Sequence, residues 1–268
     1  MPPRERIEIG PLTQALLDAS VWSRDSLFPY WQARADDAEA VLSFLLDQGV
    51  LESFRRRFAA RESEGAWAEA RAGLFLWRNG FRILQWEPRA VPERPGDIDV
   101  QYGDTEPVFV EVKGPGWQGE LSDEERSRGR KEQSKFEGIE ARSVGPSASA
   151  CYAIDKAIPK FSSHRCNLVV IVDDLYISPV ELPEGWLEHD VTEHLVKTPR
   201  GSSVGGALFV WVTQSGGPVE YRHRFVRHSA ANRPLPASVV ERLAAGNWHE
   251  EPGVSPLETL GLLPSPGL

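Results

Sequence analysis

The stretch that decides the fold runs from Gly96 to Gly114 and reads GDIDVQYGDTEPVFVEVKG. Residues 97–102 alternate polar and apolar side chains, and residues 107–113 are rich in β-branched and aromatic side chains. Both patterns are typical of β-strands. The turn-forming residues at 103–106 lie between them, so the stretch predicts a β-hairpin.

The hairpin gathers charged side chains on one face. Successive side chains of a strand point to opposite faces, so Glu111 and Lys113 lie on the same face, about 7 Å apart along the strand. Asp97 and Asp99 likewise share a face of the preceding strand. The two polar faces can lie on the same side of the folded hairpin, which would crowd several carboxylates together.

Crowded carboxylates on a half-buried face repel one another and lose hydration. A divalent cation removes this penalty, and carboxylate oxygens with water suit Mg²⁺ or Mn²⁺ better than Zn²⁺. Lys113 would then orient or help deprotonate an attacking water, or stabilise charge on a phosphate. The alternative interpretation is an edge strand whose outward charges protect against aggregation.

A helix is predicted before the hairpin, at residues 64–80, and Asn79-Gly80 is a typical helix end. Its apolar face has helical spacing and consists of Ala68, Ala72, Phe75 and Leu76. Glu69 borders this face, where a carboxylate has either a functional role or a salt bridge to a nearby arginine. Arg71 and Arg78 lie seven residues apart and are interpreted as a solvated stripe.

In this order, the segments resemble the PD-(D/E)XK nuclease superfamily, which has the restriction-endonuclease-like fold. The similarity covers about residues 64–175 and is greatest to small bacterial members related to Holliday-junction resolvases. The segments that carry it are Glu69 on the helix, a strand at 81–86, Asp99 on the second strand and Glu111-Val112-Lys113 on the third. One departure is that Ile98 precedes Asp99, where the family pattern has proline.

The resemblance implies an α/β fold with an αβββαβ core and a mixed central sheet flanked by helices. It implies that Asp99 and Glu111 are metal ligands, that Glu69 is an accessory ligand or orienting group, and that Lys113 is catalytic. Asp97 is a weaker candidate for a residue of this site. The implied cofactor is Mg²⁺, which Mn²⁺ can replace. The implied activity is that of a metal-dependent deoxyribonuclease, more specifically an endonuclease.

A basic helix is predicted to begin at Ser122, soon after Lys113. Candidate nucleic-acid contacts are Arg126, Arg130, Lys131 and Gln133, together with Lys156 on a later predicted helix at 149–161. The alternative is an ordinary solvated helix whose acidic start and basic end suit the helix dipole. Lys156 and Lys160 form a stripe that either contacts phosphate or is simply solvated.

Composition places the chain among globular proteins. It has 268 residues, 41% of them hydrophobic, and nine tryptophans. We expect a helical N-terminal extension at 1–62, a nuclease-like core at 63–230, and a C-terminal helix with a proline-rich tail at 231–268. Two cysteines suggest no disulfide framework, and neither a signal peptide nor a membrane-spanning segment is apparent. A cytoplasmic location without membrane contact is therefore expected.

A net charge of −9 argues mildly against nucleic-acid binding, which phosphate neutralisation drives. This charge is compatible with a protein partner, or a second copy of the chain in a homodimer, that supplies the affinity for nucleic acid. DNA is favoured over RNA as the substrate. The alternative function is a catalytically silent nuclease-fold module that acts in protein or nucleic-acid binding.

Overall fold

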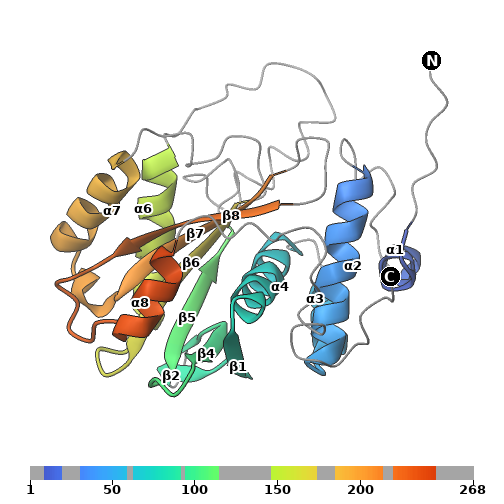
Figure 1. Cartoon of the computed structure of the whole chain (residues 1–268), viewed down its shortest axis with the longest axis horizontal. Coiled ribbons are helices and arrows are strands. Elements are labelled where there is room, and N and C mark those ends of the chain that lie inside the picture. The colour runs from blue at the N-terminus through green and yellow to red at the C-terminus, as the bar shows by residue number, and fades with distance from the viewer. Residues whose placement is uncertain are drawn as a thin grey trace, which may run out of the picture.

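The computed structural model describes residues 9–19, 31–58, 63–91, 94–114, 146–173, 185–213 and 220–245. The chain folds as an α/β protein in which N-terminal helices precede a six-stranded mixed sheet flanked by helices (Figure 1). The helices are α1 (Pro11–Ala19), α2 (Trp31–Asp47), α3 (Leu51–Phe58), α4 (Ser63–Arg78), α6 (Pro146–Ala157), α7 (Trp186–Lys197) and α8 (Ala237–Ala244), with 3₁₀ helices η3 (Ile158–Lys160) and η5 (Gly201–Ser203). The strands are β1 (Phe81–Trp86), β2 (Arg89–Val91), β3 (Arg94–Pro95), β4 (Ile98–Tyr102), β5 (Val108–Lys113), β6 (Cys166–Asp173), β7 (Gly206–Thr213) and β8 (Glu220–Arg227).

The main sheet has the strand order β1-β4-β5-β6-β7-β8. Strands β1, β4 and β5 pair antiparallel, β5, β6 and β7 pair parallel, and β8 returns antiparallel to β7. Strands β2 and β3 form a separate two-stranded ribbon. With the β2–β3 ribbon and η3 set aside, the chain order α4-β1-β4-β5-α6-β6 confirms the predicted αβββαβ core.

The predicted hairpin is present as β4 and β5. Its register pairs Ile98 with Val110, Asp99 with Phe109, and Val100 with Val108. The turn is closed where the Thr105 N–H donates to the Tyr102 carbonyl oxygen at 3.2 Å. This register decides which acidic residue lies beside Glu111.

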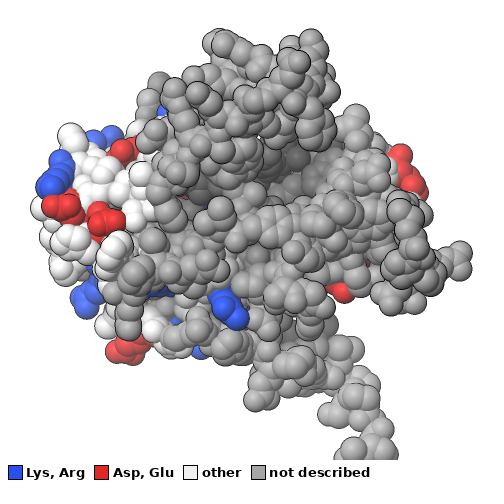
Figure 2. All heavy atoms as spheres, turned by 90° about the horizontal axis from the view of Figure 1, so that it is seen from above, with Lys and Arg blue, Asp and Glu red and all other residues white. Residues whose placement is uncertain are grey.

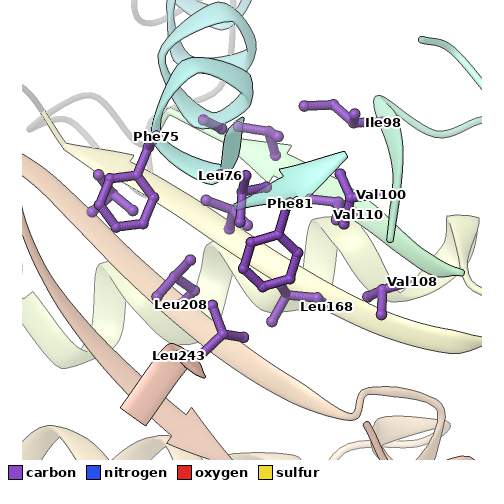
Figure 3. Packing of buried hydrophobic residues seen from close by; sticks show 14 of the residues in the cluster. Phe75, Leu76, Phe81, Ile98, Val100, Val108, Val110, Leu168, Leu208 and Leu243 are labelled. Carbon is purple, nitrogen blue, oxygen red and sulfur yellow. The ribbon is translucent and has the colours of Figure 1, made fainter. Parts of the chain in front are cut away.

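Helices cover both faces of the sheet. On one face, α4 and α8 share one core with the apolar side chains of the sheet, among them Ile98, Val100 and Val110 (Figure 3). On the opposite face, α6 and α7 share a second core with Phe109, whose ring meets the Phe161 ring edge-on at 6.0 Å between centroids. The alternation predicted from the sequence therefore separates two cores.

Helix α4 is covered on two sides, because α2 and α3 pack against the side that faces away from the sheet. The prediction that Arg71 belongs to a solvated stripe is wrong. Arg71 is buried, and its Nη2 atom lies 2.8 Å from Asp37 Oδ2 of α2. The helical extension supplies this partner, which the apolar pattern of α4 alone does not reveal.

Helix α6 ends at Ala157, and the 3₁₀ helix η3 follows. The helix predicted at 149–161 therefore ends early, and Pro159, which cannot donate a backbone hydrogen bond, lies in the middle of η3. Among the helices that the structure describes, none combines the length and the apolar character needed to cross a bilayer.

Candidate active site

Glu111 is the centre of the candidate site. It lies on β5 with no exposed surface, on the same face of the strand as Phe109. Its Oε1 atom accepts hydrogen bonds from the ammonium groups of Lys113 and Lys160, the second at 2.6 Å. No donor among the described residues reaches its Oε2 atom. Burial, and secondly the nearby charge of Asp97, raises the pKa of Glu111 to about 7.

Asp97 lies beside Glu111. It comes one residue before β4, and continuing the antiparallel register of the hairpin places it opposite Glu111. Its Oδ2 atom accepts the N–H of Val112 at 2.7 Å, so the carboxylate continues the ladder beyond the end of β4. Its Oδ1 atom lies 3.6 Å from Nζ of Lys160. Asp97 and Glu111 therefore share one ammonium group.

Asp99 is engaged elsewhere. Arg165 donates from Nη2 to Asp99 Oδ1 at 2.6 Å, and the guanidinium group lies over the Phe109 ring, 5.0 Å from its centroid. Asp99 pairs across the hairpin with Phe109, not with Glu111. The structure thus places Asp97, rather than Asp99, opposite Glu111, whereas the family resemblance implies Asp99 as the metal ligand.

Glu69 reaches the same region from α4. Its Oε1 atom accepts a hydrogen bond from Arg57 at 2.5 Å, which is the salt bridge to a nearby arginine that the sequence left as an alternative. Burial raises the pKa of Glu69, and the charges of Asp97 and Lys160 also influence it. Glu69 therefore lies within electrostatic reach of Asp97 and Lys160.

Charges of both signs meet at this site. The carboxylates are Glu69, Asp97 and Glu111, and the cations are Arg57, Lys113 and Lys160. We name these six residues the carboxylate–lysine cluster. Sequence reasoning missed Lys160 as a member, although Phe161 beside it is fully buried and places η3 against the sheet. The available signal in the sequence was the apolar Phe161 directly after Lys160, because a buried residue there holds the lysine close to the sheet.

Of the other predicted nucleic-acid contacts, the structure describes only Lys156. Lys156 is exposed on α6, and its Nζ atom lies 5.2 Å from the centroid of the Tyr152 ring. Arg126, Arg130, Lys131 and Gln133 fall outside the described residues. Where the described surface near α6 and α7 is visible in Figure 2, acidic and basic side chains are mixed.

The carboxylate oxygens of Asp97 and Glu111 suit Mg²⁺ better than a metal that needs many protein ligands. Within the described ranges, no three His, Cys, Asp or Glu side chains are grouped closely enough to form a metal centre. Mg²⁺ commonly keeps several waters and uses one or two carboxylates. Asp97 and Glu111 supply two, and Glu111 Oε2 is a buried acceptor that meets no described donor. These residues therefore fit a Mg²⁺ ion.

Comparison with known proteins adds little. No protein-family model and no curated protein matches the chain. Among solved structures, the chain is similar to that of Pyrococcus furiosus SfsA in complex with Ca²⁺, with 18% identity and a TM-score of 0.30. The match covers 64% of this chain and 66% of that chain, slightly less than two thirds of its length. A similarity this distant supports no conclusion about function.

Proposed function

We propose that this protein is a Mg²⁺-dependent nuclease of the PD-(D/E)XK type that hydrolyses phosphodiester bonds, in DNA rather than RNA. One observation carries the proposal: buried Glu111 meets Asp97 and Lys113 at one end of the hairpin of an αβββαβ core. Burying ionised carboxylates together costs free energy, and groups held together at such a cost are typical of functional sites. A metal-dependent reaction is a function that needs them.

Asp97 and Glu111 would hold the Mg²⁺ ion, which when bound neutralises charge on the phosphate and lowers the pKa of a water ligand. Asp97 is oriented for this role because the Val112 N–H holds its Oδ2 atom. Glu69 acts from the margin as an accessory carboxylate, oriented by Arg57. The backbone of β5 fixes Glu111 relative to both.

Lys113 is the residue that acts on the substrate. It follows Glu111 by two positions on β5, so both side chains leave the strand on the same face. Its ammonium group contacts Glu111 and is partly exposed, with 22% of the side chain accessible. From there it donates a hydrogen bond to a phosphate oxygen and stabilises the negative charge that develops during attack by water.

A catalytically silent binding module is the second candidate. The charge balance of the carboxylate–lysine cluster favours it, because Arg57, Lys113 and Lys160 already neutralise the three carboxylates without a metal. In that case the six residues stabilise the fold, and neither metal binding nor cleavage occurs.

A cleavage assay separates the two candidates. The protein is incubated with single-stranded, duplex and branched DNA and with RNA, in Mg²⁺, in Mn²⁺ and in a chelator. We expect metal-dependent cutting of DNA, with internal cuts in circular substrates. Asp97→Asn, Glu111→Gln and Lys113→Met should each lower the rate at least about a hundredfold.

Lys197→Met is the matched control, because Lys197 forms an exposed pair with Glu193 on α7. Cutting that survives all three site substitutions would show that another site or a contaminant is responsible. Absence of both cleavage and metal binding would support the binding module.

A further inference from the structure

Lys160 holds the position between the two central carboxylates. Its Nζ atom lies 2.6 Å from Glu111 Oε1 and 3.6 Å from Asp97 Oδ1. We propose that Lys160 is an internal placeholder cation: it occupies the metal position in the metal-free protein and is displaced when a divalent cation binds. This inference rests on the proposed metal site and names a competing residue within it.

The backbone beneath Lys160 is held firmly. Ile158 and Phe161, on either side of Pro159 and Lys160, are both buried, and the Phe161 N–H donates to the Ile158 carbonyl oxygen at 3.1 Å. Proline restricts the backbone of η3 further. The lysine side chain, by contrast, is 30% exposed and has four flexible methylene groups. Its ammonium group can therefore leave the carboxylates without movement of the main chain.

The ammonium group is suited to neutralise this site. Its Nζ atom lies within ion-pairing distance of both Asp97 and Glu111, and two nearby carboxylates favour the charged form of a lysine. Without Lys160, two adjacent carboxylates would face each other with Lys113 bound to only one of them.

A metal ion and this ammonium group cannot share the same oxygens. Both are cations, and at hydrogen-bonding distances in a partly buried site their repulsion is large. Binding of Mg²⁺ or Mn²⁺ therefore displaces Lys160 from the carboxylates. The free energy needed to release the lysine lowers the net affinity for the metal. Removing the lysine should make metal binding tighter, whereas removing a carboxylate should make it weaker.

The test compares Mn²⁺ binding to the metal-free wild type and to Lys160→Met and Lys160→Gln, by calorimetry and by the spin resonance of free Mn²⁺. We expect both variants to bind Mn²⁺ about tenfold more tightly, the order of magnitude for loss of one competing charge-assisted hydrogen bond. Both should also melt at a lower temperature without metal, and saturating Mn²⁺ should restore the melting temperature. Two variants are used so that poor folding of one does not decide the result.

Lys197→Met again serves as the control, since it removes the same charge from an exposed pair. Unchanged or weaker Mn²⁺ binding in both Lys160 variants would overturn the inference, as would absence of Mn²⁺ binding in every protein tested. If wild type cuts DNA but the variants bind no more tightly, the inference alone fails. If the variants bind more tightly but wild type cuts no nucleic acid, the proposed hydrolysis alone fails.

Discussion

Two aspartates that are two positions apart have different surroundings. Asp97 faces Lys160 and the Val112 N–H, whereas Asp99 is bound to Arg165. We expect Asp97→Asn to weaken Mn²⁺ binding by at least about tenfold, because the amide keeps the acceptor for Val112 but loses the charge. Calorimetric titration of the metal-free protein measures this effect.

Asp99→Asn is the informative comparison. It should leave Mn²⁺ affinity within about twofold and lower the free energy of unfolding by about 1–3 kcal/mol, because Arg165 loses a charged partner. Urea denaturation measures the second effect. Loss of metal binding in Asp99→Asn with retention in Asp97→Asn would restore the assignment expected from the sequence.

Glu111 makes stability depend on pH. Its pKa in the folded protein is about 7, above the ordinary 4.5, so the folded state holds this proton more tightly than the unfolded chain does. Without metal, the free energy of unfolding should therefore fall as the pH rises from about 4.5 to about 7, by up to about 3 kcal/mol from this group. Above pH 7 the contribution should level off.

Glu111→Gln removes this titration. Relative to wild type, the variant should therefore gain stability steadily between pH 5 and pH 7, as followed by urea denaturation in a chelator at each pH. A difference that stays constant across this range would show that Glu111 titrates normally in the folded protein.

At the scale of elements, the position of α4 depends on a glycine. A β-carbon at Gly73 would lie 2.5 Å from the Trp86 ring of β1 and 3.2 Å from the Phe44 ring of α2. Alanine normally stabilises a helix interior by up to about 1 kcal/mol relative to glycine. We expect Gly73→Ala to do the opposite and destabilise the protein by about 1–3 kcal/mol, because two aromatic rings must move.

Gly65→Ala is the control on the same helix, since a β-carbon there meets no described atom outside its own helix within 4 Å. Thermal and urea denaturation of both variants should give shifts of opposite sign. Stabilisation by both substitutions would mean that α4 is packed less closely against α2 and β1 than the structure shows.

At the scale of the whole molecule, one buried polar group joins the N-terminal helices to the far edge of the sheet. Asp37 of α2 accepts hydrogen bonds from Arg71 of α4 and from the Tyr221 hydroxyl of β8. Burial, first, and the negative charge of Asp37 raise the pKa of Tyr221 well above its ordinary value. Elements that are far apart in the sequence are therefore linked through a single carboxylate.

Asp37→Ala should consequently destabilise the entire protein. Loss of one member of a buried ion pair costs about 3–5 kcal/mol. We expect a single unfolding transition at lower urea concentration, with tryptophan fluorescence and circular dichroism changing together. Glu193→Ala, which breaks an exposed pair on α7, should leave the midpoint of urea unfolding unchanged. Separate transitions would show that the N-terminal helices unfold independently of the sheet.

The sequence by itself determined the class of fold, the hairpin and the strand that carries Glu111 and Lys113. These features follow from local patterns: alternation along a strand, helical spacing of apolar residues, and glycine or proline at the ends of elements. Such patterns also placed Asp97 and Asp99 together on one face, and the family resemblance favoured Asp99 as the metal ligand.

Only the tertiary structure shows which of the two aspartates lies opposite Glu111. The pairing of Asp99 with Phe109 sets the register, and the register brings Asp97 opposite Glu111. Lys160, Arg57 and Asp37 reach their partners from helices that are distant in the sequence, so no spacing rule links them to the hairpin. Register and helix packing depend on the fit of many side chains at once, which is why the composition of the site is a tertiary property.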